Sequence, residues 1–499
     1  MATKRNLLSN FFGQGWVALM NLAFVPLYVR YLGVESYGLI GIFTLLQAWL
    51  FFLDLGLSPA LNREMARFIG GGHTPQSIRD LLRSVEILGG AIALFVCLGI
   101  WGSSDWLAAH WLRDDKINSV VVAQSLTIMG VIAVMNFLEN IYRSSLMGLQ
   151  RQVFLNGLTI VLSTLQGLGA VGILIWFSPT IQAFFLWQGL LSIVSVGVLA
   201  LSVYHVLPSA PARARFSPLA LKNVWGFAAG TLTLTLLGFI LSQADKLILS
   251  RLLSLKDFGY YALAFSLAGA IGRLSFPLHQ AIFPKLTTLC QEKNEPLLAL
   301  TYHKASQLTA VLIGSAGLIL ILFGEWVLIL WTGNGELAER VYPILWILSI
   351  GMILNNLIST PYSLQMAAGW TGLGIKINSI MVIVFVPVLY FFAREFQAVG
   401  AAVTWGLVNL TYLVVIPVFM HRRLLKNAMA DWYIKDLFIP LFTAAATAAT
   451  LRLIFPHQPT RGPMFIYLIS AAFATLAAAA LAARQVRLEI RAKLTFLLG

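Results

Sequence analysis

The sequence predicts an all-α polytopic membrane protein with about 14 transmembrane helices, arranged as two pseudo-symmetric six-helix lobes plus a C-terminal helix pair. Hydrophobic residues make up 59% of the 499 positions and charged residues only 11%, whereas soluble domains carry roughly 25% charged residues. Apolar segments of membrane-crossing length follow one another along nearly the whole chain. A short segment that lies between two of them occurs twice, at residues 30–38 and again at residues 251–259.

Each predicted span is an apolar run of about 20 residues, which is the length that a helix needs to cross the hydrocarbon core. The first run is too long for a secretory signal peptide and has no small-residue cleavage site after it, so we expect it to remain as a span. The fourteen spans lie near residues 8–30, 37–60, 84–103, 119–138, 153–177, 180–204, 223–248, 260–283, 306–329, 341–360, 377–393, 398–419, 436–455 and 463–483.

The basic residues predict the orientation of the chain in the membrane. If the N-terminus is placed inside the cell, most of the 34 Lys and Arg residues fall in cytoplasmic segments, as the positive-inside rule expects. We therefore place both termini in the cytoplasm. The formal charge of +14 needs no nucleic acid as a partner, because basic loops that face anionic membrane lipids account for it.

The repeated segment predicts a duplicated bundle of helices. Arg30-Tyr-Leu-Gly-Val-Glu-Ser-Tyr-Gly38 returns as Arg251-Leu-Leu-Ser-Leu-Lys-Asp-Phe-Gly259, and each copy follows one span and precedes another. Both units start on the same side of the membrane, so the repeat is parallel. Because the linker-like segment 208–215 separates the sixth span from the seventh, we expect an N-lobe at 1–210, a C-lobe at 211–422 and a final helix pair at 423–499.

Polar residues inside membrane spans are costly and usually face a bundle interior or a water-filled cavity. The first, second, seventh and eighth spans carry such residues at helical spacing, which predicts a polar cavity shared by the two lobes. Small and weakly polar residues also suit close helix packing, so packing remains an alternative for them. The uncharged residues that we expect to line the cavity are Gln14, Asn21, Gln47, Ser242 and Gln280.

Three charged residues lie well inside predicted spans. Arg273 is near the middle of the eighth span, and Lys246 and Asp54 lie about one or two turns inside theirs. A charge at the centre of a span costs about 2.5–3.5 kcal/mol on a translocon scale, which favours a functional role for Arg273 over a purely structural ion pair. Asp245 and Lys246 are adjacent and point about 100° apart on a helix, so we expect each of them to pair with another helix.

Other charged residues lie at the ends of spans. Arg30 and Arg251 can reach the membrane interface there at little cost, so both membrane anchoring and ligand binding stay open for them. For Glu139 and Arg143, which also lie at a span end, we expect helix-end interactions.

Several classes of function are excluded by missing patterns. The chain has no Walker A sequence, its seven His residues show no metal-binding spacing, and no nucleophile–base or carboxylate pair stands out. Its two cysteines imply no disulfide framework. We therefore expect no enzyme activity, no cofactor and no metal, with energy supplied by an ion gradient such as H⁺ or Na⁺, by the membrane potential or by the substrate gradient.

Two motifs resemble those of a known family. Residues 30–38, followed by Asp54-Leu-Gly-Leu-Ser-Pro-Ala-Leu-Asn-Arg-Glu-Met-Ala66, look like the start of bacterial polysaccharide-unit flippases. These are the O-antigen transporters of the multidrug/oligosaccharidyl-lipid/polysaccharide exporter superfamily. Asp245-Lys-Leu-Ile-Leu-Ser-Arg251 and Phe258-Gly-Tyr-Tyr261 are similar to that family's seventh and eighth spans.

The resemblance implies a flippase in the bacterial inner membrane. It would move undecaprenyl-diphosphate-linked oligosaccharide repeat units to the periplasmic leaflet for O-antigen, capsule or exopolysaccharide assembly, by alternating access through a cationic cavity. Its partners would be this lipid-linked oligosaccharide, membrane lipids, and a polysaccharide polymerase or ligase. Carried over to this chain, the resemblance assigns substrate contact to Arg30, Lys246, Arg251 and Arg273, and gating or ion coupling to Asp54 and Asp245.

Two alternatives stay open. An ion-coupled multidrug or metabolite exporter and a lipid II flippase share the fold that the resemblance implies. The exporter would be favoured if Asp54 and Asp245 bound a cation while Arg273 proved dispensable. A membrane-embedded glycosyltransferase or polymerase would need a large external loop or a cluster of carboxylates, and the sequence shows neither.

Overall fold

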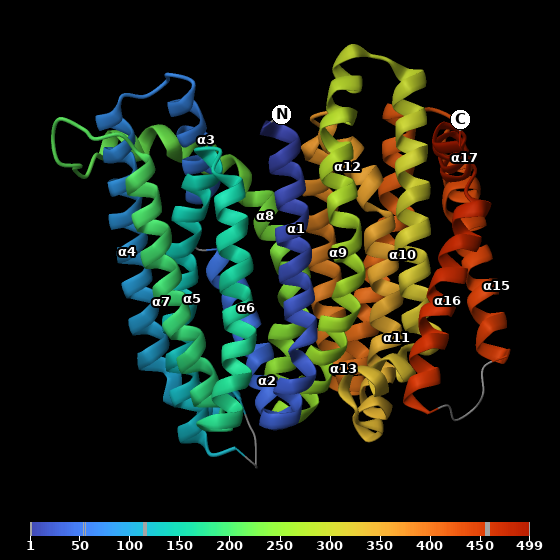
Figure 1. The fold of residues 1–499 in the computed structure, drawn as a ribbon, viewed down its shortest axis with the longest axis horizontal. Helices are drawn as coiled ribbons and strands as arrows, with labels where there is room; N and C mark the ends of the chain where they lie inside the picture. The colour runs from blue at the N-terminus through green and yellow to red at the C-terminus, as the bar shows by residue number, and fades with distance from the viewer. Residues whose placement is uncertain (1, 53, 55, 113–116, 455–459, 499) are drawn as a thin grey trace. The chain divides into compact units, whose positions relative to one another are not determined.

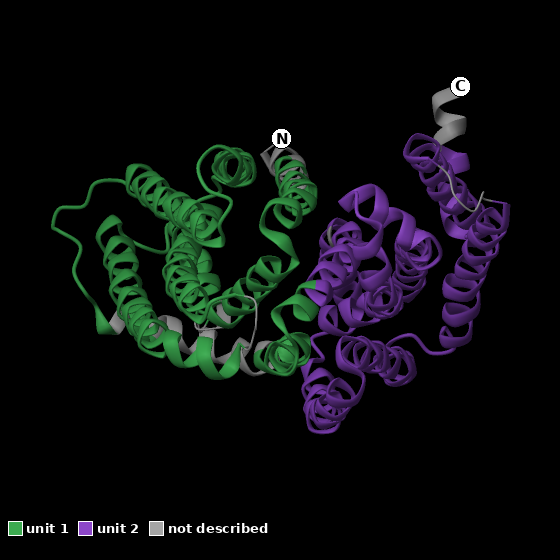
Figure 2. Ribbon diagram, turned by 90° about the horizontal axis from the view of Figure 1, so that it is seen from below, with its two compact units in different colours: residues 1–259 green, residues 260–499 purple. Residues whose placement is uncertain are grey.

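The computed structural model describes residues 2–52, 54, 56–112, 117–454 and 460–498, and these residues form helices and no strand (Figure 1). They build two compact units, Met1–Gly259 and Tyr260–Gly499 (Figure 2). Within the described residues, 11 helical segments are long and apolar enough to cross a membrane. The predicted all-α membrane fold is therefore confirmed.

The first unit is built from the N-terminal helices. Some of these helices pack on the next helix along the chain, as α5 does on α4. Others pack on helices further along the chain, as α5 does on α7 and α1 does on α6. The elements are α1 (Ala2–Ala23), α2 (Val25–Phe52), α3 (Leu57–Ile69), α4 (Pro75–Trp106), η1 (Leu107–Trp111), α5 (Ser119–Gly148), α6 (Gln152–Trp176), α7 (Ile181–Val206), α8 (Pro218–Leu252) and the start of α9 (Leu255–Glu292).

The second unit holds the rest of α9 and all later helices. Here α10 packs on α11, and α15 and α16 pack on α10 and on each other. The elements are α10 (Glu295–Thr332), α11 (Gly335–Leu357), α12 (Ser359–Ala367), α13 (Thr371–Leu424), α14 (Met429–Asp431), η2 (Trp432–Phe438), α15 (Ile439–Ile454), α16 (Arg461–Ala482) and α17 (Arg484–Leu498).

The helices are consistent with fourteen spans. The 54-residue α13 contains the eleventh and twelfth predicted spans and is broken between them at Gln397, whose φ is 52°. Helix α8 contains the seventh predicted span, 223–248, whereas the first predicted span, 8–30, runs past the end of α1 at Ala23 into α2. The boundary between the compact units falls at Gly259 because α8 packs on α2, α3 and α4 of the first unit. The predicted division into two lobes and a final helix pair describes the order of the spans along the chain, whereas the compact units describe how the helices pack. The predicted division therefore stays a prediction.

The second predicted span, 37–60, is wrong at its C-terminal end. Helix α2 ends at Phe52, and a separate helix, α3, begins at Leu57 after Gly56, whose φ of 78° lies in the left-handed region. Glycine adopts this conformation without steric cost, so the helix breaks inside the apolar run. The polar residues beyond position 53 consequently do not continue the face of α2 that carries Gln47.

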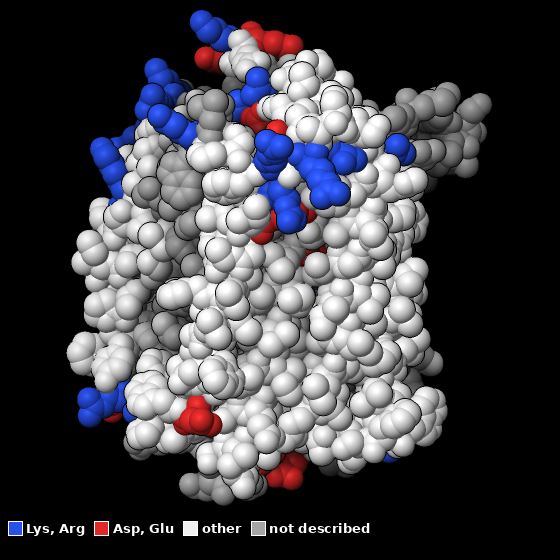
Figure 3. Space-filling model, turned by 90° about the vertical axis from the view of Figure 1, so that its left-hand side faces the viewer, with Lys and Arg blue, Asp and Glu red and all other residues white. Residues whose placement is uncertain are grey.

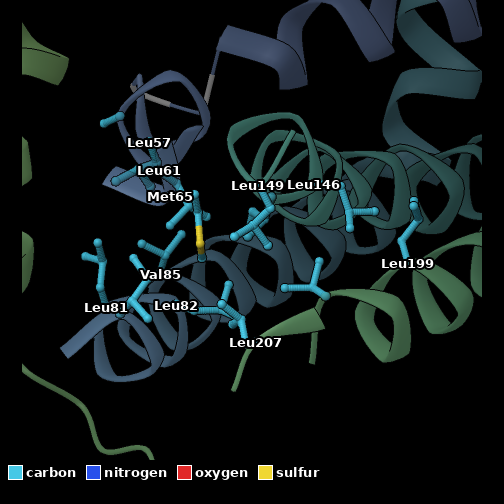
Figure 4. Close-up of a cluster of buried hydrophobic side chains, with 14 of the residues drawn as sticks. Leu57, Leu61, Met65, Leu81, Leu82, Val85, Leu146, Leu149, Leu199 and Leu207 are labelled. Carbon is cyan, nitrogen blue, oxygen red and sulfur yellow. The ribbon is translucent and has the colours of Figure 1, made fainter. Parts of the chain in front are cut away.

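Helix α3 belongs to a buried apolar cluster that it shares with other helices of the first unit (Figure 4). Leu57, Leu61 and Met65 are spaced four residues apart and so lie on one face of α3. The other members of the cluster come from α4, α5, α6 and α7 of the same unit and include Leu81, Leu82 and Val85 of α4, Leu146 of α5, and Leu199 and Val203 of α7. This cluster fixes the short helix onto the bundle.

Lys and Arg side chains gather at one end of the face shown in Figure 3, beyond a broad zone without charges. An uncharged zone bounded by basic residues is typical of a membrane-crossing surface with its cytoplasmic side at the basic end. The orientation itself stays a prediction.

A buried carboxylate on α3 stabilises the connection between α3 and α4. The Glu64 Oε2 atom lies 2.7 Å from His73 Nε2 and accepts a hydrogen bond from Arg67 at 3.0 Å, and Arg63 Nε lies 3.8 Å from the same carboxylate. Burial alone would raise the pKa of Glu64, but the hydrogen bond from His73 and the charge of Arg67 outweigh it, so the pKa lies below its ordinary value.

This lowered pKa predicts a loss of stability in acid. A carboxyl group whose pKa is depressed in the folded state stabilises the fold above its unfolded pKa, which is about 4.3 for Glu, and loses that contribution as the pH falls towards the folded pKa. We expect the thermal unfolding temperature of the wild type to fall more between pH 7 and pH 4 than that of Glu64→Gln. Equal falls in both proteins would contradict this.

Candidate functional site

The two copies of the repeated segment meet each other in the structure. A Cβ atom added at Gly38 of α2 would lie 2.2 Å from the carbonyl oxygen of Leu255, and one added at Gly259 of α9 would lie 2.4 Å from the carbonyl oxygen of Val34. Leu255 and Val34 each lie four residues before the glycine of their own copy. Only glycine permits such an approach of two helix backbones, which explains why both copies end in this residue.

The two repeated arginines are exposed and lie beside aromatic rings. The Arg30 guanidinium lies 6.0 Å from the centroid of the Tyr31 ring, and that of Arg251 lies 5.9 Å from the Trp111 ring. Trp111 Nε1 in turn donates a hydrogen bond to Ser250 Oγ at 3.1 Å. Both guanidinium groups are thus accessible, and neither of the two roles left open for them is excluded.

Asp245 and Lys246 pair with each other, although the sequence predicts that they point apart on the helix; their pairing with another helix stays a prediction. Lys246 Nζ lies 3.2 Å from Asp245 Oδ1 and also donates to the carbonyl oxygen of Ser242 at 3.1 Å. The four-carbon stem of lysine is flexible enough to bring its ammonium group back to the preceding residue. Both side chains are buried, and the Ser242 hydroxyl donates to the carbonyl of Phe239.

Asp54 caps a helix. It is buried, and its carboxylate accepts hydrogen bonds from the backbone N–H and the hydroxyl of Ser58 in the first turn of α3. A carboxylate at a helix N-terminus satisfies otherwise unpaired N–H groups and interacts favourably with the helix dipole. These contacts give Asp54 a structural role in this state, and its predicted gating role stays a prediction.

Arg273 differs from Lys246 because it is exposed. It lies on α9 between Gly269 and Pro277, and within the described part of the chain it forms no ion pair. The predicted cavity residues Gln14, Asn21 and Gln280 are exposed as well. The polar cavity shared by the two lobes stays a prediction.

Gln47 lines a cavity that lies within the first unit. The cavity has a volume of about 350 Å³ and is lined by residues of α1, α2, α5, α6 and α7. Helix α5 contributes four polar residues at positions i, i+3, i+4 and i+7, which place them on one face of the helix. These are Asn136, Glu139, Asn140 and Arg143.

Glu139 and Arg143 form an ion pair inside this cavity. Arg143 Nε donates to Glu139 Oε1, and Arg143 Nη1 donates to Thr159 Oγ1 at 3.0 Å. Our expectation of helix-end interactions for these two residues is therefore wrong, because their partners are each other and α6. The stripe on α5 was visible in the sequence as four polar residues with heptad spacing, and this spacing was the signal that could have identified the cavity.

No group of three or more His, Cys, Asp or Glu residues in the described ranges is arranged to hold a metal ion. The carboxylates of the candidate residues are bound to a lysine, an arginine or a helix N-terminus. The described residues include an exposed arginine on α9 and a polar cavity in the first unit.

Comparison with known proteins identifies the family to which this chain belongs. Residues 3–290 match the family described as "Polysaccharide biosynthesis protein". A protein of Shigella flexneri named "Putative O-antigen transporter" is 20% identical over 408 residues, which cover 82% of this chain and 95% of that protein. A protein of Klebsiella pneumoniae named "Uncharacterized membrane protein in cps region" is 26% identical over 215 residues, which cover 41% of this chain and 42% of that protein.

Solved structures show the same fold at low sequence identity. The lipid II flippase MurJ in an inward closed conformation has a TM-score of 0.66 at 13% identity, covering 96% of this chain and 98% of that chain. An inward-facing multidrug resistance MATE family transporter of the MOP superfamily has a TM-score of 0.66 at 15% identity, covering 84% of this chain and 96% of that chain. The family match covers more than half of the sequence, so this protein belongs to the polysaccharide biosynthesis protein family.

Proposed function

We propose that the protein is a flippase that moves undecaprenyl-diphosphate-linked oligosaccharide repeat units from the cytoplasmic to the periplasmic leaflet of the bacterial inner membrane. The single observation that carries this proposal is the similarity to the Shigella flexneri protein over 95% of that protein's length. The product would feed the assembly of O-antigen, capsule or exopolysaccharide.

Two features of the chain support this choice. The fold is shared with MurJ, which is named a lipid II flippase. Arg273 places an exposed guanidinium in the middle of a long apolar helix, where it can bind a diphosphate through paired charge-assisted hydrogen bonds. Such a group is costly in lipid and suits a path taken by an anionic headgroup.

A cation-coupled multidrug exporter is the second candidate, because a MATE family transporter has the same TM-score as MurJ. The contacts of Asp54 and Asp245 favour the flippase over this alternative. Both carboxylates already bind groups of this chain. An exporter of cationic compounds needs a carboxylate that leaves such a partner in order to bind the substrate.

The proposal is tested by reconstituting the purified protein in liposomes with a fluorescent undecaprenyl-diphosphate oligosaccharide from the host strain. We expect the protein to bring label to the opposite leaflet, where an added reagent quenches it. Liposomes with protein that show no more quenching than empty liposomes would contradict the proposal. Export of a cationic dye without movement of the lipid would favour the second candidate.

Arg273→Ala is expected to lower this transport by about tenfold or more, since one charge-assisted hydrogen bond contributes about 1.5–3 kcal/mol. The matched control is Arg394→Ala, which removes an exposed arginine from α13 and should leave the rate unchanged. Both variants are compared at equal abundance in the membrane. Wild-type transport by Arg273→Ala would remove this residue from the mechanism.

A further inference from the structure

The cavity in the first unit has an electrically balanced polar lining. Of the described residues around it, only Glu139 and Arg143 are charged, and these two form an ion pair. A site for a free cation would need an excess of carboxylate oxygens, and a site for a phosphate would need an excess of basic groups. The lining therefore favours a ligand that is polar and uncharged.

Unused hydrogen-bonding groups face this cavity. Within the described chain, the side-chain amides of Gln47, Asn140 and Gln166 form no hydrogen bond, although each of them lines the cavity. The Ser195 hydroxyl, on α7, is also without a partner and the residue is only 2% exposed. A buried polar group in a protein nearly always has a partner, so the Ser195 hydroxyl indicates a ligand or ordered water, and the three half-buried amides that line the same cavity are free to bind that ligand.

The chemistry of these groups fits hydroxyl-bearing ligands. A carboxamide offers both a donor and an acceptor, which matches the two roles of a sugar hydroxyl. Three carboxamides from three different helices, α2, α5 and α6, can bind hydroxyls that lie around one ring. The apolar wall formed by Leu50, Phe137 and Leu162 suits the C–H face of the same ring, and the volume of about 350 Å³ lies in the range of small-molecule pockets.

We infer that this cavity is a binding site for a neutral sugar residue. The choice of a sugar among hydroxyl-rich ligands rests on the proposed function, in which the protein handles an oligosaccharide. In that setting the site would hold a sugar of the repeat unit while the lipid-linked diphosphate is held elsewhere by basic side chains. It would contribute to selection among repeat units by the pattern of their hydroxyls.

The test measures binding without transport. The probe is the oligosaccharide repeat unit of the host's own surface polysaccharide, cut free of lipid and titrated by calorimetry into the full-length protein in lipid nanodiscs. We expect saturable binding by the wild type. Asn140→Leu and Gln166→Met, which keep side-chain size but remove the amide, should each weaken this binding at least tenfold.

Matched controls separate the cavity from a general loss of structure. Gln124→Met removes an exposed amide from the same helix, α5, outside the cavity, and should bind like the wild type. All variants should unfold near the wild-type temperature, since the amides of Asn140 and Gln166 form no hydrogen bond within the described protein, and that of Gln124 accepts only one long hydrogen bond, from Gln182 at 3.5 Å. Unchanged binding by both cavity variants would overturn the inference, and so would an absence of probe binding to the wild type.

The result also separates this inference from the proposed function. Transport of the lipid-linked substrate together with unchanged binding in the cavity variants would overturn the sugar site and leave the flippase standing. Probe binding that is lost in the variants, in a protein that moves no lipid-linked substrate, would support the site and contradict the flippase. Sodium ions are titrated as a second probe, and the heat released should be the same for the wild type, Asn140→Leu and Gln166→Met. Sodium binding by the wild type that is lost in these variants would overturn the neutral-ligand assignment.

Discussion

Gly38→Ala is expected to destabilise the protein severely, although it adds a single methyl group. The new Cβ would lie 2.2 Å from a backbone oxygen, that of Leu255, and a backbone cannot rotate away as a side chain can. Overpacking costs about 1–3 kcal/mol where side chains can adjust, so we expect at least about 3 kcal/mol here. The thermal unfolding temperature of the purified protein and its yield in the membrane should both fall.

Gly197→Ala is the matched control for this substitution. Gly197 lies on α7 with nothing within 4 Å of its added Cβ, and alanine in an open helix position is favoured over glycine by about 0.5–1 kcal/mol. The control should therefore be as stable as the wild type or slightly more stable. Gly259→Ala should resemble Gly38→Ala, and a wild-type unfolding temperature for either would show that the two helices can separate freely.

Asp436→Ala is expected to loosen the C-terminal helices. Asp436 is buried on η2, where it contacts His303 Nδ1 and accepts a hydrogen bond from Gln307 Nε2 at 2.8 Å. Gln307 Oε1 accepts from the backbone N–H of Gln485 at 2.7 Å, so the same network reaches α17. Leaving the buried Gln307 amide without its acceptor costs about 1–3 kcal/mol, and the loss of the His303 contact adds to this.

The matched control for Asp436→Ala is the substitution Asp431→Ala, five residues earlier in the chain. Asp431 is exposed and pairs with Lys435, also exposed, and such surface pairs contribute about 0–1 kcal/mol. Asp431→Ala should therefore leave the thermal unfolding temperature nearly unchanged. We expect limited proteolysis to cut the C-terminal helices sooner in Asp436→Ala than in Asp431→Ala. Equal rates of cleavage in the two variants would contradict the anchoring role.

The fold was predictable because the membrane imposes a simple pattern on the sequence. Apolar runs of about 20 residues mark the helices, and the described helices follow them closely from α5 onwards. The break between α2 and α3 was missed because residues 37–60 look like one apolar run. Its signal was local: Gly56 permits the left-handed turn and Asp54 caps the helix that follows.

The candidate site was less predictable, since it depends on side-chain conformation. Helical geometry gives the directions of Asp245 and Lys246 at the backbone, yet a long lysine side chain can return to its neighbour and does so here. Taken one at a time, Glu139 and Arg143 are charged residues at a span end. Together with Asn136 and Asn140 they form a stripe, and only the packing of α5 against α2 and α6 shows that the stripe lines a cavity.

The contact between Gly38 and Gly259 has the reciprocal form of an isologous interface. Residue 38 meets the carbonyl of residue 255 and residue 259 meets that of residue 34, and adding 221 to each number of the first copy gives its counterpart in the second. A homodimer with twofold symmetry makes contacts of this kind. The two copies therefore meet at this crossing as the two halves of a symmetric dimer interface do.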